Sequence, residues 1–215
     1  MSHALAAAFG QELRDRGMDG ARPGGDGLVG VSGAGRRIAG SLLSKKIDVT
    51  WTTEESGLLL GISLKTINFR DGNSGNYQKN LTNRRGDLAV EAMTLHGRFP
   101  YAVLAGLLIL DKGATTDNTA KRNSTFTNAF PKVRSLTDRG KPSGQEEQFE
   151  RCYIMVVDAN PFQPSLECYH AKDPVNAVPL EAVFDDLVAL VLERNFEFYE
   201  PSGSGELRET GTKES

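Results

Sequence analysis

Apolar residues recur with helical or strand periodicity along much of this 215-residue chain. Three segments have helical spacing and are predicted to be helices: residues 3–16, 86–97 and 180–196. Four segments have strand-like patterns: residues 45–51, 58–69, 101–110 and 152–157. The last two are almost unbroken apolar runs, which are typical of strands buried on both faces. This order of elements predicts an α/β fold with a central sheet flanked by helices on both faces.

The segments between these elements are polar or rich in glycine. Residues 17–35 contain eight glycines and are predicted to form a loop. We also expect loops at 70–85, which is rich in Asn and Gly, and at 111–124. Residues 201–215 are rich in Gly, Ser and Glu, so we expect a disordered tail. The remaining residues, 1–200, are predicted to form a single domain.

The strand predicted at 58–67 carries a lysine among hydrophobic residues. Because side chains alternate across a strand, one face should consist of Leu58, Leu60, Ile62 and Leu64. The opposite face should then carry Gly61, Ser63 and Lys65. A lysine is rarely buried without a charged partner. We therefore expect a carboxylate close to Lys65.

The preceding strand offers such a carboxylate at Asp48. Alternation places Ile47, Val49 and Trp51 on one face, and Asp48 and Thr50 on the other. If the chain turns at about residues 55–56, residue 48 lies opposite residue 63. We therefore expect Asp48, Ser63 and Lys65 to meet on one surface of the sheet.

The charge distribution indicates where an anionic partner could bind. The whole chain has a net charge of −3. Residues 36–98 contain ten Lys/Arg and six Asp/Glu, which gives a net charge of +4. Residues 141–215 contain six Lys/Arg and fifteen Asp/Glu, which gives a net charge of −9. A basic middle and an acidic end suggest one face suited to an anionic partner. Differences of this size also arise by chance on solvated surfaces.

Cellular location is inferred from absent signals. The apolar runs are too short to span a membrane, so no membrane association is expected. The N-terminus lacks the basic start of a signal peptide. Cys152 and Cys168 form no disulfide framework or metal-binding pattern. We therefore expect a cytoplasmic protein.

An aspartate beside a lysine on adjacent strands suits phosphodiester hydrolysis. The carboxylate can bind Mg²⁺, which prefers oxygen ligands. The metal polarises the phosphate and activates water. The ammonium group can stabilise the negative charge that develops on the phosphate.

With these residues the chain resembles the PD-(D/E)xK nuclease superfamily. Ile47-Asp48 corresponds to the "PD" and Ser63-Leu64-Lys65 to the "(D/E)xK". The order helix, strand, strand, helix, strand over residues 3–110 also fits, so the resemblance covers about half the chain. It implies a restriction-endonuclease-like mixed central sheet and a Mg²⁺-dependent DNA endonuclease.

Ser63 departs from the family pattern, which has a second acid at this position. A neutral hydroxyl does not replace a metal-binding carboxylate. Some family members have Ser-x-Lys and take the acid from the following helix. Here that helix carries Asp87 and Glu91, four residues apart and so on one face. The resemblance therefore implies Asp48, Ser63, Lys65 and Glu91 as catalytic residues, with Asp48, Glu91 and Asp87 as Mg²⁺ ligands.

Several other residues are candidates for contacts with DNA or metal. Five basic residues could contact phosphates, although a solvated surface explains each equally well: Arg36, Arg37, Lys79, Arg84 and Arg85. Glu12 could be the first-helix glutamate that contacts a metal-bound water in many family members, or simply an exposed acid.

Two functions remain open from the sequence. The first is a Mg²⁺-dependent DNA endonuclease of the restriction-endonuclease type, with a possible partner methyltransferase or defence-system subunit. Because cutting both strands usually requires two active sites, a homodimer is expected. The alternative is a non-catalytic nucleic-acid-binding or protein-interaction module on a degenerate nuclease fold that has lost its acid at Ser63.

Overall fold

A computed structural model describes residues 2–24, 32–67, 72, 77–203 and 206–211. Its α-helices are α1 (Ser2–Arg14), α2 (Leu81–His96), α3 (Thr125–Val133) and α4 (Leu180–Arg194). Short 3-10 helices cover Gln78–Asn80, Lys112–Thr115 and Arg134–Leu136. The strands are β1 (Arg36–Ala39), β2 (Ser44–Ile47), β3 (Val49–Thr53), β4 (Gly57–Ile67), β5 (Val103–Asp111), β6 (Arg151–Asp158), β7 (Ser165–His170), β8 (Tyr199–Pro201) and β9 (Leu207–Glu209).

Five strands form a mixed central sheet in the order β3-β4-β5-β6-β7. The chain passes from β4 to β5 through α2, and the two strands are parallel. β5 and β6 are also parallel, whereas β3 and β7 pair antiparallel with their neighbours at the two edges. Two antiparallel pairs, β1-β2 and β8-β9, lie outside this sheet. The α/β class and the mixed central sheet expected from the sequence are therefore confirmed.

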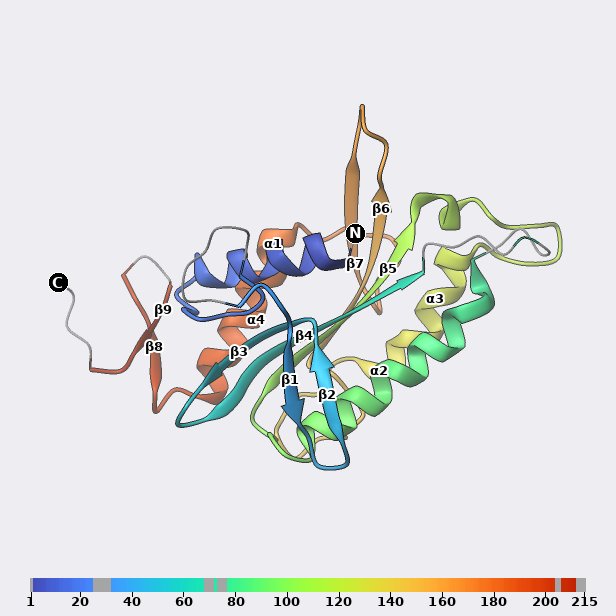
Figure 1. Cartoon of the computed structure of the whole chain (residues 1–215). Coiled ribbons are helices and arrows are strands. Elements are labelled where there is room, and N and C mark those ends of the chain that lie inside the picture. Colours follow the sequence, from blue (N-terminus) through green and yellow to red (C-terminus); the bar gives the residue numbers. More distant parts are fainter. Residues whose placement is uncertain (1, 25–31, 68–71, 73–76, 204–205, 212–215) are drawn as a thin grey trace.

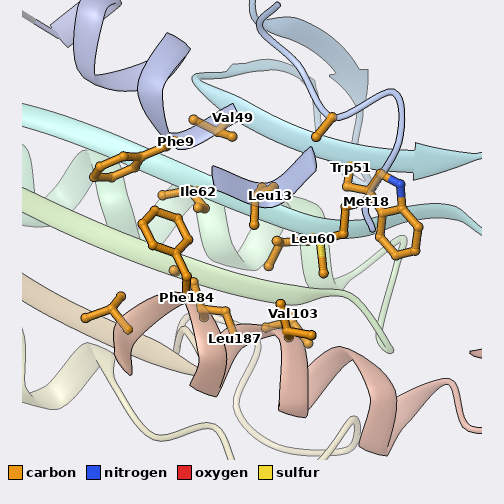
Figure 2. Close-up of a cluster of buried hydrophobic side chains, with 14 of the residues drawn as sticks. Phe9, Leu13, Met18, Val49, Trp51, Leu60, Ile62, Val103, Phe184 and Leu187 are labelled. Atoms are coloured by element: carbon orange, nitrogen blue, oxygen red, sulfur yellow. The ribbon is translucent and has the colours of Figure 1, made fainter. Parts of the chain in front are cut away.

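Helices α1 and α4 cover one face of the sheet, and α2 and α3 cover the other (Figure 1). Figure 2 shows the first layer, in which Phe9 of α1 meets Phe184 of α4 edge to face beside Ile62 of β4. On the opposite face a second apolar cluster contains Leu81, Leu88, Ala92 and Leu95 of α2. Within the described residues, no helix is both long enough and apolar enough to cross a membrane.

The strand expected at 45–51 is divided by a bend at Asp48 into β2 and β3. The predicted faces are wrong at this point. Ile47 packs in the cluster on the α2 side, whereas Val49 and Trp51 pack on the α1 and α4 side. The register is nevertheless as expected, because Val49 pairs with Ile62 and places position 48 level with Ser63.

A second break in alternation occurs near the β3-β4 turn. The register shifts between Trp51, which pairs with Leu60, and Thr52, which pairs with Leu58. The extra residue on β4 moves Leu58 to the α2 side of the sheet, away from Leu60. The expected face was therefore wrong at Leu58 and right at Leu60, Ile62 and Leu64.

Several segments differ from the expected elements. Helix α2 begins at Leu81, within the loop predicted at 70–85, because buried Leu81 anchors its first turn. Helix α3 and strand β7 were not predicted. The tail predicted to be disordered contains β9, whose Leu207 is buried against the α1 and α4 layer.

The C-terminal end of α2, the helix that carries Glu91, is fixed by a buried charged network centred on Glu150. Oε1 of Glu150 accepts hydrogen bonds from Arg139 (3.1 Å) and Arg194 (2.6 Å). Oε2 accepts from the Leu104 amide (2.7 Å) and lies 3.2 Å from Nε2 of His96, the last residue of α2. Burial opposes ionisation, but the hydrogen bond and charge of His96, the charge of Arg194 and the Leu104 amide together hold the pKa of Glu150 below its usual value.

We predict that Glu150→Gln lowers the free energy of unfolding at pH 7 by about 3 kcal/mol, because it leaves buried guanidinium groups without a counter-charge. The lowered pKa stabilises the fold at pH values above the unfolded-chain value of about 4.3. This stabilisation is lost as the pH falls through the folded-state value. Chemical denaturation of both proteins at several pH values should therefore show a difference that shrinks in acid. A constant difference would contradict an ionised Glu150.

Candidate active site

Three consecutive residues near the end of β4 contact two acidic side chains. The Ser63 and Lys65 side chains project from the sheet towards α2 and contact Glu91. The backbone N–H of Leu64 lies in the plane of the sheet and donates to Asp48. The segment Ser63-Leu64-Lys65 is therefore approached by Glu91 from one face and by Asp48 from the strand edge.

Glu91 is buried between α2 and the sheet, with 3% of its surface exposed. Its Oε1 accepts a hydrogen bond from Ser63 Oγ at 2.5 Å, and its Oε2 lies 2.7 Å from Lys65 Nζ. The Lys65 side chain is 16% exposed, so this pair is largely shielded from water. The carboxylate that pairs with Lys65 is thus Glu91, and the expectation that Asp48 fills this role was wrong, because Asp48 accepts from the Leu64 amide instead.

Asp48 occupies the bend between β2 and β3 and is half-buried. Its Oδ2 accepts from the Leu64 amide at 2.7 Å, so the side chain takes the place of a backbone carbonyl in the ladder. Because the Asp48 carboxylate accepts this hydrogen bond in place of a backbone carbonyl, the chain bends here and Ile47 and Val49 point to opposite faces of the sheet. Within the described part of the chain, the Leu64 amide is the only hydrogen-bond partner of Asp48.

The glycine-rich segment before β1 lies directly against this bend. A Cβ atom on Gly35 would lie 2.6 Å from the Ile47 carbonyl oxygen and 3.2 Å from that of Asp48. Any larger residue would push the two segments apart. Residues 25–31 of the glycine-rich loop lie outside the described residues.

The structure separates Asp87 from this site. Its side chain is 52% exposed and lies 3.3 Å from Arg84 one turn earlier on α2. Both residues line a polar cavity of about 620 Å³, together with Lys45 of β2. Of the two acids considered on this helix, Glu91 meets Ser63 and Lys65, whereas Asp87 forms a surface ion pair.

The basic residues considered for DNA contacts fall into two groups. Arg85 donates to the Lys132 carbonyl at 3.0 Å and so ties α2 to α3. Arg36 donates to Thr52 Oγ1 on β3. Arg37 and Lys79 are exposed, and Arg84 is partly exposed. Arg84 is also paired with Asp87, so Arg37 and Lys79 are the most exposed of these five residues.

Glu12 does not join the site, because α1 lies on the opposite face of the sheet. Its carboxylate pairs with Arg16 at 2.6 Å, and Arg16 also binds Asp185 of α4. The structure adds Lys45 to the basic residues near α2, because Lys45 lines the same cavity as Arg84. The sequence analysis did not single out this residue. The signal was present, since Lys45 and Lys46 are adjacent basic residues just before Asp48.

Within the described residues, no group of three or more His, Cys, Asp or Glu side chains could hold a metal ion. The carboxylates that approach Ser63-Leu64-Lys65 are Asp48 and Glu91. Comparison with protein-family models, curated proteins and solved structures found no match.

We predict that Lys65→Met lowers the free energy of unfolding by about 3 kcal/mol, because it leaves Glu91 buried without a cation. Adding Glu91→Gln should recover at least about half of that loss, since the remaining amide is neutral. The matched control is the exposed ion pair on the same helix, where Arg84→Met should change stability by less than about 1 kcal/mol. Urea denaturation of the four proteins measures these differences. Equal losses for Lys65→Met and Arg84→Met would contradict a buried pair.

Proposed function

We propose that this chain is a Mg²⁺-dependent DNA endonuclease of the restriction-endonuclease type. The observation that carries the proposal is the convergence of Glu91, Lys65 and Ser63, with Asp48 bound to the backbone between the latter two. Two carboxylates and one ammonium group at a single strand segment form the charge set that phosphodiester hydrolysis needs.

The order of elements supports the same proposal. Helix α1, the β3-β4 hairpin, helix α2 and parallel strand β5 follow one another, as the resemblance to the PD-(D/E)xK superfamily implies. Helix α2 supplies the acid that position 63 lacks, as in the Ser-x-Lys members of that family. We therefore include a restriction-endonuclease-like fold in the proposal.

Asp48 and Glu91 fit Mg²⁺ as ligands, because this cation takes oxygen donors and is commonly bound by one or two carboxylates together with substrate phosphate. Mg²⁺ bound there would polarise the phosphate and activate water for attack. Ser63 keeps the Glu91 carboxylate oriented through its hydrogen bond. Lys65 Nζ lies 2.7 Å from Glu91 and would stabilise charge on the phosphate oxygens.

Charge on the two faces indicates how DNA would approach. The side of the molecule formed by β1, β2 and α2 carries exposed or partly exposed Arg37, Lys45 and Arg84. On the opposite face, α4 carries Glu181, Asp185 and Glu193 on its exposed side. We therefore place DNA over the α2 side, where Lys45 and Arg84 line one cavity.

The alternative function is a non-catalytic nucleic-acid-binding module, and one observation favours it. Both oxygens of Glu91 already have protein partners, so Ser63, Lys65 and Glu91 satisfy one another without a ligand. A buried ion pair of this kind can serve the fold alone. The two functions differ in whether DNA is cut, and cleavage assays distinguish them.

We predict that the protein nicks or linearises plasmid DNA with Mg²⁺ and does not do so with EDTA. Asp48→Asn and Glu91→Gln should each reduce the rate by about 100-fold or more, because each removes a charge that acts on the transition state. Asp87→Asn is the matched control and should stay within about threefold of the parent rate, since Asp87 lies outside the site. Gel-based cleavage assays measure all four proteins.

Two outcomes would overturn this prediction. DNA binding without cleavage under any divalent cation would favour the non-catalytic module. Cleavage that survives Glu91→Gln but is abolished in Asp87→Asn would show that the wrong acid has been placed in the site. Circular dichroism of each variant shows whether a loss of rate reflects loss of fold.

We also predict that Arg84→Ala weakens binding to DNA of any sequence and lowers the slope of log affinity against log salt by about 1, because one phosphate contact is lost. Lys172→Ala, a change to an exposed lysine that pairs with Asp138, is the control and should leave the slope unchanged. Fluorescence anisotropy in EDTA measures binding without cleavage. An unchanged slope for Arg84→Ala would show that DNA does not lie over this side of α2.

A further inference from the structure

Strands β1 and β2 form a short antiparallel ribbon outside the central sheet, and the turn that joins them carries two exposed leucines. The cross-strand pairing ends on either side of residues 40–43, which form the turn. Within it the Gly40 amide donates to the Leu43 carbonyl at 3.1 Å. Leu42 and Leu43 have 64% and 47% of their surface accessible. Two adjacent apolar side chains are therefore open to solvent at the tip of a narrow element.

The tip of the ribbon is held by the C-terminal end of α2, beside which it lies (Figure 1). The Ser41 amide donates to the Thr94 carbonyl at 2.8 Å, and the Ser41 hydroxyl donates to the same oxygen at 3.1 Å. Arg98, just beyond α2, donates to the Ala39 carbonyl at 2.9 Å. A Cβ atom on Gly40 would clash with Thr94, so the turn packs closely on the helix. The two leucines thus sit on a fixed support, and little conformational freedom would be lost when they bind.

The ribbon itself is basic, since its two strands and their turn contain four Lys/Arg and no Asp/Glu. Arg37 and Lys46 pair across the ribbon and are both exposed, so their side chains lie together on its outer face. Lys45 belongs to the other face, where it lines the cavity of about 620 Å³ together with Arg84 of α2. The acid that lines this cavity, Asp87, is paired with Arg84. The ribbon therefore combines an apolar tip with a positively charged body.

We propose that this ribbon is a wedge that kinks duplex DNA, with Leu42 and Leu43 inserted between adjacent base pairs from the minor groove. Apolar side chains inserted in this way unstack a base step and bend the duplex by roughly 20–90°. The phosphates that border the groove then lie beside the basic residues of the ribbon and bind them by charge. The choice of DNA as the partner rests on the proposed function, whereas the wedge itself goes beyond it.

The position of the ribbon favours DNA over an anionic membrane, which a basic element with an apolar tip also suits. Strand β2 leads directly from the tip to the candidate active site, because Leu43 precedes Asp48 by five residues. At about 3.3 Å per residue this is roughly 17 Å, or about five base pairs at about 3.4 Å each. A duplex bound at Asp48 thus passes within reach of the tip. The kink is then expected about five base pairs from the bond that is cut.

The test compares binding in EDTA to a fully paired duplex and to one with a central mismatch, which is easier to kink. The parent should bind the mismatched duplex about tenfold more tightly, because deformation opposes binding less. The variant with both Leu42→Ser and Leu43→Ser should show a preference below about twofold and keep the parent's salt dependence. Arg37→Ala combined with Lys46→Ala should instead lower the slope of log affinity against log salt by about 2. Energy transfer between dyes at the two duplex ends should rise with the parent and not with the leucine variant.

Phe162→Ser is the matched control and should change neither measurement, although Phe162 on the β6-β7 hairpin is even more exposed, at 90%. Melting temperatures check the fold, and Leu42→Ser alone replaces the double change if that change lowers stability. DNA that stays straight when bound, or a mismatch preference that survives in the leucine variant, would overturn the wedge and leave the proposed nuclease standing. A protein that binds no DNA would overturn both. Binding to phosphatidylserine vesicles in place of DNA would make a membrane surface the partner of the ribbon.

Discussion

The burial of one carboxylate between α2 and the central sheet constrains the rest of this site. Glu91 is almost without contact with water, and a buried charge is tolerated only when it is paired and hydrogen-bonded. Lys65 and Ser63 meet that requirement from alternate positions of β4. The pairing therefore fixes the rotation of α2 about its own axis. The same rotation leaves Asp87 and Arg84 on the surface.

Three other contacts hold α2 at fixed points along its length. Leu81 anchors its first turn in the apolar cluster, and Arg85 donates to the Lys132 carbonyl of α3. At the C-terminal end His96 contacts Glu150, which also binds Arg139 and Arg194. Helix α2 is thus held against the sheet from end to end. A site built on it and on β4 has little freedom to rearrange, which suits chemistry that depends on fixed charges.

Local patterns predicted the parts of this structure that depend on period and spacing. The buried strand β5 and the level of position 48 with Ser63 followed from the sequence. The strand pattern offered Asp48 as the partner of Lys65, whereas Glu91 holds that place, and only the family resemblance pointed to an acid on this helix. The bend at Asp48 was not predicted, because it arises when a side chain replaces a backbone acceptor. The start of α2 was missed because polar residues 82–87 separate Leu81 from Leu88. The ordered Leu207 was missed because only tertiary packing reveals its burial.

A crystal of the protein soaked with Mn²⁺ shows whether Asp48 and Glu91 bind one cation together, as the proposed function requires. Manganese takes the same oxygen ligands as magnesium and is located by its anomalous scattering. We expect an anomalous peak bounded by the carboxylates of Asp48 and Glu91, at about 2.1 Å from an oxygen of each. A peak at Asp87 or elsewhere, with Glu91 still closed on Lys65 and Ser63, would contradict it.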